Sequence, residues 1–562
     1  RSYSPKLTLD NFGLSEADLD STFEAGHEIG LGPVPLREIV QLLDETYCNS
    51  IGAEYRFIRH PEKLKWLETR MESSRNLPDF KKEQKLHILG KLNEAIGFES
   101  YLHSKFLGHK RFAISGGESI IPGLDTIIEY GAEQGAREFV IGMPHRGRLN
   151  VLVNIMGKPY NEIFSEFEGK DYSSDFFIGD VKYHLGYRNR INTRSGKTVD
   201  LNLMPNPSHL EAVDPYTQGV ARSRIDHKYS GDVNKLIPII IHGDAAIAGQ
   251  GIVYEVLQMS QLKGFHTGGT IHIVINNQIG FTTDYLDGRS STYCTDVAKV
   301  TLCPVFHVNA DDVEAVVLAI RLAVEYRQKF HTDVFIDLLG YRKYGHNESD
   351  EPKFTQPKLY KLIENHPDAR RIYIEKLVEE KTIEMSHGKE LEKAFKSRLK
   401  QIHSRIDIES IDQGEKIVRD NYLGKKHKYD FESAPETALT QSRIRKLGEK
   451  TYTIPGNIKV IAKTKKLYDQ RKLKLLQSNT IDWPMAEAIA FASLLDEGTN
   501  IRFSGQDSQR GTFSQRHSIL KTEDTEQAYV PLNHLSRNQG KLEIYNSLLS
   551  EYGVLGFEFG YA

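Results

Sequence analysis

Residues 237–246 read Ile-Pro-Ile-Ile-Ile-His-Gly-Asp-Ala-Ala, and residues 271–280 read Ile-His-Ile-Val-Ile-Asn-Asn-Gln-Ile-Gly. Both stretches begin with a mostly β-branched run without polar alternation, which is typical of a strand buried on both faces of a parallel sheet. Between them, apolar residues recur within 251–265 at helical spacing. The two stretches therefore predict a strand–helix–strand unit.

The same pattern extends to both sides of this unit. Phe139–Met143, Val305–Val308 and Val334–Leu339 predict further strands, and Asp311–Phe330 predicts a helix with an acidic first turn. Apolar strands separated by helices imply an α/β fold, with a doubly wound parallel sheet covered on both faces.

Changes in composition divide the chain into four predicted segments. Residues 1–105 form a polar helical region, and 106–354 form the α/β domain. Residues 355–480 are charged and helical, which favours a solvated connecting region. A second α/β pattern occupies 481–562, with a helix over 485–496 and then a strand.

That second pattern contains few strands before Ala562. Since so few strands cannot close a core, we expect the native protein to continue beyond this residue.

Net charge, the lengths of the apolar runs and the number of cysteines narrow the class of protein. The 562 residues include 73 Lys and Arg against 76 Asp and Glu, which gives a net charge of −3 and no electrostatic reason to expect a nucleic-acid partner. No apolar run approaches the roughly 18–20 residues that span a bilayer. Three cysteines are too few for a disulfide framework, which favours a reducing compartment such as the bacterial cytoplasm or the mitochondrial matrix.

Polar residues follow both strands of the central unit. Asp244 comes after the first strand and Asn277 after the second. In an open parallel sheet, ligands bind outside the carboxyl ends of the strands. Carboxylate, amide and backbone oxygens suit Mg²⁺, which usually keeps phosphate oxygens among its ligands. Gly243 and Gly280 would let the backbone approach a diphosphate, and a helix starting near Gly249 would add its N-terminal dipole. A purely structural alternative stays open, in which Asp244 caps a helix and Asn276 and Asn277 form a turn.

Other enzyme classes lack their motifs. Ser195–Thr198 ends like a nucleotide-binding P-loop, but Ile191 stands where the leading glycine belongs. Neither a dinucleotide-binding Gly-x-Gly-x-x-Gly after a strand nor a zinc-binding His-Glu-x-x-His occurs. A non-catalytic assembly fragment stays open as an alternative.

Further blocks occur in a recognisable order between about residue 105 and the end of the chain. They are Gly142–Asn150, Gly179–His184, Asn206–Glu211, Tyr341–Glu348 and Ser504–Phe513. Together with the central unit, they resemble the signature blocks of the decarboxylating, thiamin-diphosphate-dependent component of 2-oxoglutarate dehydrogenases.

The resemblance implies a site for thiamin diphosphate and Mg²⁺. The implied metal ligands are Asp244, Asn277 and the carbonyl of Ile279. The implied cofactor contacts are Arg146, Leu210, Asp244, Ala245, Ala246, Asn277, Ile279 and, from a partner subunit, Gln506. The implied substrate contacts are His145, His184 and Ser208. His209 is a further candidate, which either helps to hold the substrate or supports the residues that do. The implied catalytic residues are His145, His184 and Glu551, the last at the aminopyrimidine ring.

The resemblance also implies an activity and partners. The expected reaction is oxidative decarboxylation of 2-oxoglutarate in the tricarboxylic acid cycle. A homodimer would pass the succinyl group to the lipoyl arm of a dihydrolipoyl succinyltransferase, in a complex with dihydrolipoyl dehydrogenase. The alternative substrate is 2-oxoadipate, but the triplet Lys182-Tyr183-His184 is closer to the 2-oxoglutarate branch.

His346 either touches the diphosphate or orders its loop.

Overall fold

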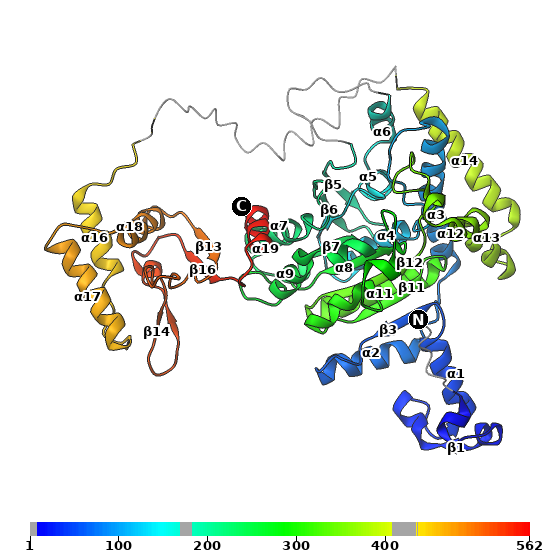
Figure 1. Ribbon diagram of the computed structural model, residues 1–562, viewed down its shortest axis with the longest axis horizontal. Helices are drawn as coiled ribbons and strands as arrows, with labels where there is room; N and C mark the ends of the chain where they lie inside the picture. The colour runs from blue at the N-terminus through cyan, green and yellow to red at the C-terminus, as the bar shows by residue number, and fades with distance from the viewer. Residues whose placement is uncertain (1–7, 169–181, 407–433, 435) are drawn as a thin grey trace. The chain divides into compact units, whose positions relative to one another are not determined.

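The computed structural model describes residues 8–168, 182–406, 434 and 436–562 (Figure 1). The chain divides into two compact units. The first comprises Arg1–Tyr422 and Phe559–Ala562, and the second comprises Leu423–Glu558. In the part of the chain that the structure describes, no helix is both long and apolar enough to cross a membrane.

An eight-stranded sheet forms the centre of the first unit. Its strands, in spatial order, are β3 (Ile51–Glu54), β11 (Val305–Asn309), β12 (Val334–Leu339), β8 (Ile271–Asn276), β7 (Leu236–Gly243), β4 (Glu138–Gly142), β6 (Thr198–Leu203) and β5 (Tyr187–Asn192). Neighbours from β11 to β6 are parallel, whereas β3 and β5 pair antiparallel at the two edges. The predicted parallel α/β fold is confirmed.

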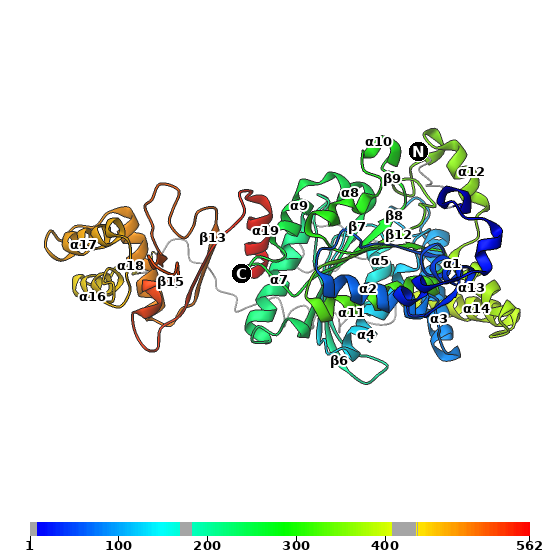
Figure 2. The same cartoon turned by 90° about the horizontal axis from the view of Figure 1, so that it is seen from below.

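Helices cover both faces of this sheet, as Figure 2 shows from below. On one face, α4 (Ile120–Glu133) and α11 (Val313–Phe330) belong to the main apolar core. On the other face, α8 (Asp244–Gly249) and α9 (Gly251–Met259) pack beside the 3₁₀ helix η5 (Cys294–Thr301). Helix α7 (Val213–Lys228) packs over β4 and β7 on that second face.

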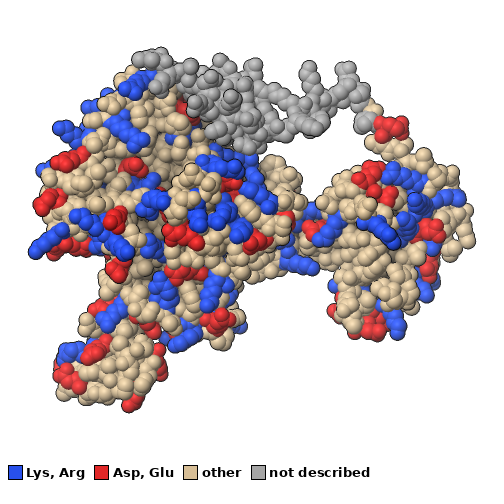
Figure 3. Space-filling view, turned by 180° about the vertical axis from the view of Figure 1, so that it is seen from behind, with Lys and Arg blue, Asp and Glu red and all other residues tan. Residues whose placement is uncertain are grey.

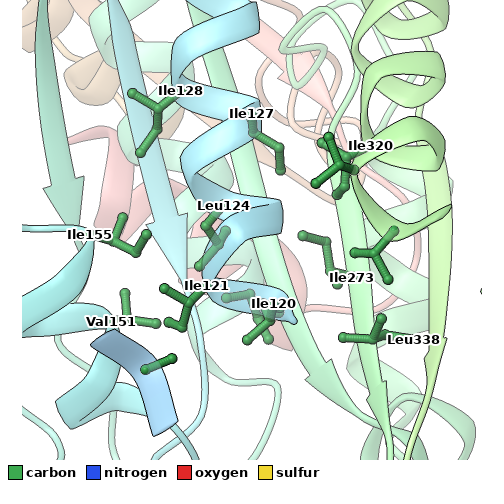
Figure 4. Close-up of a cluster of buried hydrophobic side chains, with 14 of the residues drawn as sticks. Ile120, Ile121, Leu124, Ile127, Ile128, Val151, Ile155, Ile273, Ile320 and Leu338 are labelled. Atoms are coloured by element: carbon green, nitrogen blue, oxygen red, sulfur yellow. The ribbon is translucent and has the colours of Figure 1, made fainter. Parts of the chain in front are cut away.

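The main core explains why the strands lack polar alternation. Figure 4 shows Ile120, Leu124 and Ile127 of α4 in one apolar cluster with Ile273 of β8 and Leu338 of β12. Fully burying such a side chain contributes about 1.5–3 kcal/mol. The alternate residues of the same strands pack under the second layer of helices, so both faces must be apolar.

The N-terminal region and the charged helices after the sheet join the first unit. The N-terminal elements are β1 (Thr22–Phe23), β2 (Val34–Pro35), α1 (Leu36–Tyr47), α2 (Pro61–Ser74) and α3 (Lys82–Lys105). The later helices are α12 (Pro357–Asn365), α13 (Ala369–Glu379) and α14 (Met385–His403). Leu377 of α13 and Leu399 of α14 are fully buried in the main core. These helices therefore pack on the α/β body as well as connecting it onward.

Short elements complete the first unit. They are α5 (Arg148–Asn154), α6 (Tyr160–Phe167), β9 (Ile279–Gly280), β10 (Thr283–Asp284) and α10 (Tyr285–Gly288). Ser195–Thr198 falls at the turn between β5 and β6, where Gly196 has φ +76°. The fragment resembling a P-loop is thus a hairpin turn.

The second unit contains helices and few strands. Its elements are α16 (Gln441–Thr451), α17 (Ala462–Leu476), α18 (Trp483–Asp496), β13 (Ile501–Gly505), β14 (Leu520–Lys521), β15 (Ala528–Tyr529) and β16 (Leu542–Asn546). Strands β13 and β16 are parallel, and α16 and α18 pack in the same apolar cluster as these strands. Helix α19 (Tyr552–Tyr561) contains the boundary between the units.

Candidate active site

The carboxyl ends of β7 and β8 bring two predicted metal ligands to one edge of the sheet. Asp244 follows β7 as the first residue of α8, and Asn277 follows β8, its parallel neighbour. The two loops lie close together, because a Cβ added to Gly280 would lie 2.6 Å from the Cβ of Ala245. Ala245 is exposed and Ala246 is buried.

Asp244 is a buried carboxylate, only 2% exposed. Burial raises the pKa of Asp244 to about 6, and the nearby Arg289 opposes that rise. Nη1 of Arg289 lies 3.7 Å from Oδ2 of Asp244. Arg289 is one positive partner of this deeply buried carboxylate, and a bound cation could supply a closer one.

The turn after β8 places the other two predicted ligands. Asn277 is 8% exposed, and its Oδ1 accepts a hydrogen bond from the N–H of Ile279 over 3.2 Å. Ile279 is buried at the start of β9. Carboxylate, amide and carbonyl oxygens are the hard donors that Mg²⁺ prefers, so this set of residues fits the metal and the diphosphate that would accompany it.

The helix expected near Gly249 is present, because α9 starts at Gly251. A separate short helix, α8, was not predicted: it begins at Asp244 and ends at Gly249, and Gln250 with extended backbone angles separates it from α9. A Cβ added to Gly243 would meet no atom within 4 Å. The backbone at the end of β7 is therefore open to a close neighbour.

A second group of predicted residues follows β4. Arg146 donates from Nη1 to the carbonyl of Ala113 over 3.0 Å and from Nη2 to the carbonyl of His346 over 2.8 Å. Burial and the nearby Arg342 lower the pKa of Arg146 to about 10. Arg146 thus ties together three loops around the site.

His145 lies in an environment that disfavours its charged form. Burial, followed by the charges of Arg146 and His346, lowers the pKa of His145 to about 3. The ring of Phe112 lies 4.2 Å from the His145 ring, between centroids. The imidazole is therefore neutral at physiological pH, with one donor and one acceptor nitrogen.

The remaining substrate residues lie on neighbouring loops. His184 is 8% exposed, and its carbonyl accepts from the N–H of Asn206 over 3.1 Å. That hydrogen bond holds the His184 loop against the segment that carries Ser208 and His209, both exposed, and Leu210, which is partly buried. The first residues of the Gly179–His184 block lie outside the described residues.

Gln506 and Glu551 belong to the second unit. Gln506 directly follows β13 and is exposed. Glu551 is also exposed and precedes α19, where its carbonyl accepts from the N–H of Leu555 over 2.8 Å. The roles implied for them remain predictions.

Sequence reasoning missed residues that build this site without facing it. The buried Glu348 carboxylate accepts backbone N–H groups of Arg111, Phe112 and Ala113 at 2.8, 3.2 and 2.9 Å. Arg148 donates to the carbonyl of Met204 over 2.8 Å. Both residues lie in the signature blocks quoted from the sequence. Their charged side chains were the available signal, because a charge in a buried loop needs a partner.

A buried cluster beneath α7 looks at first like a metal centre. Glu211, Asp214 and His242 each offer a ligand atom within 4.8 Å of the others. However, Oε2 of Glu211 lies only 2.6 Å from Nδ1 of His242. Two ligand atoms around a tetrahedral zinc lie about 3.4 Å apart, so a hydrogen bond joins these residues instead.

The parallel-rich sheet is that of the thiamin-diphosphate-binding fold, in which ligands bind where parallel strands end. The family model described as Dehydrogenase E1 component matches residues 92–409, and the one described as Transketolase, pyrimidine binding domain matches 479–562. The chain belongs to the dehydrogenase E1 component family.

Curated relatives match nearly the whole chain. The "2-oxoglutarate dehydrogenase E1 component" of Haemophilus influenzae is 41% identical over 100% of this chain and 60% of its own length. The protein of the same name from Cupriavidus necator is 42% identical over 99% of this chain and 59% of its own. The "2-oxoglutarate dehydrogenase, mitochondrial" of Schizosaccharomyces pombe is 42% identical over 99% and 56%, respectively. The chain thus spans about 60% or less of the length of these relatives.

Proposed function

We propose that this chain binds Mg²⁺ and thiamin diphosphate and forms part of an enzyme that oxidatively decarboxylates 2-oxoglutarate. The observation that carries the proposal is the buried Asp244 carboxylate beside the Asn277 turn, at the edge where parallel sheets bind ligands. The names of the relatives support 2-oxoglutarate as the substrate.

The residues at the sheet edge would hold the metal and the diphosphate. Asp244, Asn277 and the Ile279 carbonyl would bind Mg²⁺, with phosphate oxygens completing the six positions. Arg146, Leu210, Ala245 and Ala246 are the further cofactor contacts on this unit. Gln506 would contribute from the partner subunit of a homodimer.

Loss of CO₂ from a 2-oxo acid leaves an electron pair that water does not stabilise. Thiamin diphosphate, when bound, supplies a thiazolium ring that accepts this pair. The neutral imidazole of His145 would donate a hydrogen bond to the substrate carbonyl oxygen as negative charge develops there. His184, Ser208 and His209 would orient the substrate, and Glu551 would hold a proton at the pyrimidine ring.

The proposed reaction ends on an external acceptor. The lipoyl disulfide of a dihydrolipoyl succinyltransferase would take up the succinyl group as a thioester and be reduced. After the succinyltransferase has passed the succinyl group on to an acceptor thiol, dihydrolipoyl dehydrogenase would oxidise the remaining dithiol to the disulfide. A reducing compartment, bacterial or mitochondrial, accords with the sources of the relatives.

The test is decarboxylation by the protein in its full natural length, with an artificial electron acceptor. We would compare 2-oxoglutarate, 2-oxoadipate and pyruvate, with and without thiamin diphosphate plus Mg²⁺. Cofactor-dependent turnover that prefers 2-oxoglutarate supports the proposal. Preference for 2-oxoadipate contradicts the proposed substrate, and absence of turnover on every 2-oxo acid contradicts the proposed reaction.

A further inference from the structure

Strand β3 brings the N-terminal region into the central sheet. It pairs antiparallel with β11, and Gly52 lies opposite His307 in the register. Glu54, the last residue of β3, reaches diagonally across this pair, and its Oε2 lies 3.2 Å from Nε2 of His307. A residue outside the predicted cofactor domain thus contacts an interior strand of its sheet.

The contact continues across the next strand. Nδ1 of His307 lies 2.8 Å from Oδ2 of Asp337 on β12, the parallel neighbour of β11. Asp337 is 3% exposed and His307 16% in their side chains. The imidazole lies between two carboxylates, so both ring nitrogens donate. Burial lowers the pKa of His307, but the bonds to Asp337 and Glu54 outweigh it and raise the pKa to about 9.

The other carboxylate oxygen of Asp337 contacts β8, the strand that Asn277 follows. Oδ1 of Asp337 accepts a hydrogen bond from Nδ2 of Asn276 over 2.9 Å. Oδ1 of Asn276 in turn accepts the N–H of Gln278 over 3.2 Å, and Gln278 has φ +67°. Residues other than glycine rarely adopt this left-handed backbone conformation. The turn around Asn277 therefore depends on hydrogen bonds such as those of the Asn276 side chain to keep its shape.

We propose that Glu54 is a positioning residue for the cofactor site, acting through His307, Asp337 and Asn276 on the turn that carries Asn277. The chain of hydrogen bonds crosses β3, β11, β12 and β8 in spatial order. It gives the N-terminal region a role in holding a metal ligand in place. The inference rests on the proposed function, because it concerns the binding of Mg²⁺ and thiamin diphosphate.

The test is calorimetric binding of thiamin diphosphate to the full chain at several Mg²⁺ concentrations. Glu54→Ala is expected to weaken Mg²⁺-dependent binding about 5- to 20-fold, on the scale of residues that support metal ligands. Glu54→Gln keeps an acceptor for His307 and is expected to remain within about 3-fold of the parent. Thermal unfolding of every variant is measured alongside.

Lys299 provides the matched control. Its Nζ lies 2.8 Å from Oε1 of Glu54, so Lys299→Ala removes the other partner of the same carboxylate and leaves His307 in place. We expect this variant to bind the cofactor like the parent. If Lys299→Ala weakens binding as much as Glu54→Ala does, the inference is overturned.

A double variant separates positioning from general stability. In the Asn276→Ala background, Glu54→Ala is expected to cause no further loss of affinity, since the chain is already broken. Independent, additive losses would overturn the inference, as would a Glu54→Ala protein that melts earlier but binds normally. A parent chain that does not bind the cofactor at any Mg²⁺ concentration would overturn both the proposed function and this inference.

Discussion

The imidazole rings of His145 and His346 meet edge to face, with centroids 6.0 Å apart, although they follow different strands of the sheet. The carbonyl of His346 also accepts from Arg146. Burial followed by the charge of Arg146 lowers the pKa of His346 to about 4, much as burial and Arg146 depress that of His145. The two rings therefore form a neutral, polar pair inside a cationic environment, which suits an acidic substrate.

Replacing His145 should affect turnover far more than cofactor binding. His145→Ala removes the proposed donor to the substrate carbonyl, so we expect turnover to fall about 10²- to 10³-fold. Thiamin diphosphate affinity should change by less than about 3-fold. His366→Ala, which removes a partly exposed histidine paired with Asp311, is the control. Unchanged turnover in the His145 variant would exclude its catalytic role.

Glu348 should stabilise the loop that packs on His145. Its side chain is 4% exposed and accepts three backbone N–H groups. Glu348→Ala leaves these donors unpaired, and we expect the free energy of unfolding to fall by about 2–4 kcal/mol in urea titration. Glu351→Ala, which removes an exposed carboxylate with one backbone partner, should cost less than about 1 kcal/mol. Equal effects would contradict this account of the loop.

Gly243 should be required by the cofactor and not by the fold. Its φ of −91° suits any residue, and an added Cβ meets no protein atom within 4 Å. Gly243→Ala is therefore expected to keep its melting temperature but to lose about 10-fold or more in thiamin diphosphate affinity, because the methyl group would enter the diphosphate's space. Gly249→Ala, equally open at the other end of α8, should bind normally. Normal binding by both variants would place the diphosphate elsewhere.

The bonds of His307 predict a pH dependence of stability. Its folded pKa of about 9 lies above the usual 6.5, so its contribution is complete below pH 6.5 and is lost as the pH rises through 9. Glu54 has a lowered folded pKa, with burial opposing the bonds to His307 and Lys299, so its contribution is present above its usual 4.5. The stability difference between the parent and His307→Gln should shrink by on the order of 2 kcal/mol from pH 6.5 to 9.5. A difference that is constant over this range would show that His307 does not gain charge on folding.

The surface carries both signs of charge. Over the face in Figure 3, blue Lys and Arg lie among red Asp and Glu on each unit. This distribution agrees with the net charge of −3.

The strands were predictable because burial on both faces leaves a strong sequence signal. Val334–Leu339 coincides with β12, and β4 is displaced by one residue from its predicted range. The start of α9 near Gly249 was predicted, but helix α8 before it was missed, because Gly249 and Gly251 look like the start of one helix rather than the junction of two.

The supporting network was harder to foresee. Glu54, His307 and Asp337 come from three distant segments, and only the register of β3, β11 and β12 brings them together. The available signal was polar residues inside otherwise apolar strands, since a buried charge needs a partner. The local sequence pattern does not show which distant residue that partner is.

The most direct test of the central claim is thiamin diphosphate binding by the chain and by its Asp244→Ala variant, with and without Mg²⁺. The account predicts that the parent binds only when Mg²⁺ is present and that the variant, still folded, loses roughly 100-fold or more in affinity. Equal binding by parent and variant, or binding independent of Mg²⁺, would contradict the assignment of this sheet edge as the metal and diphosphate site.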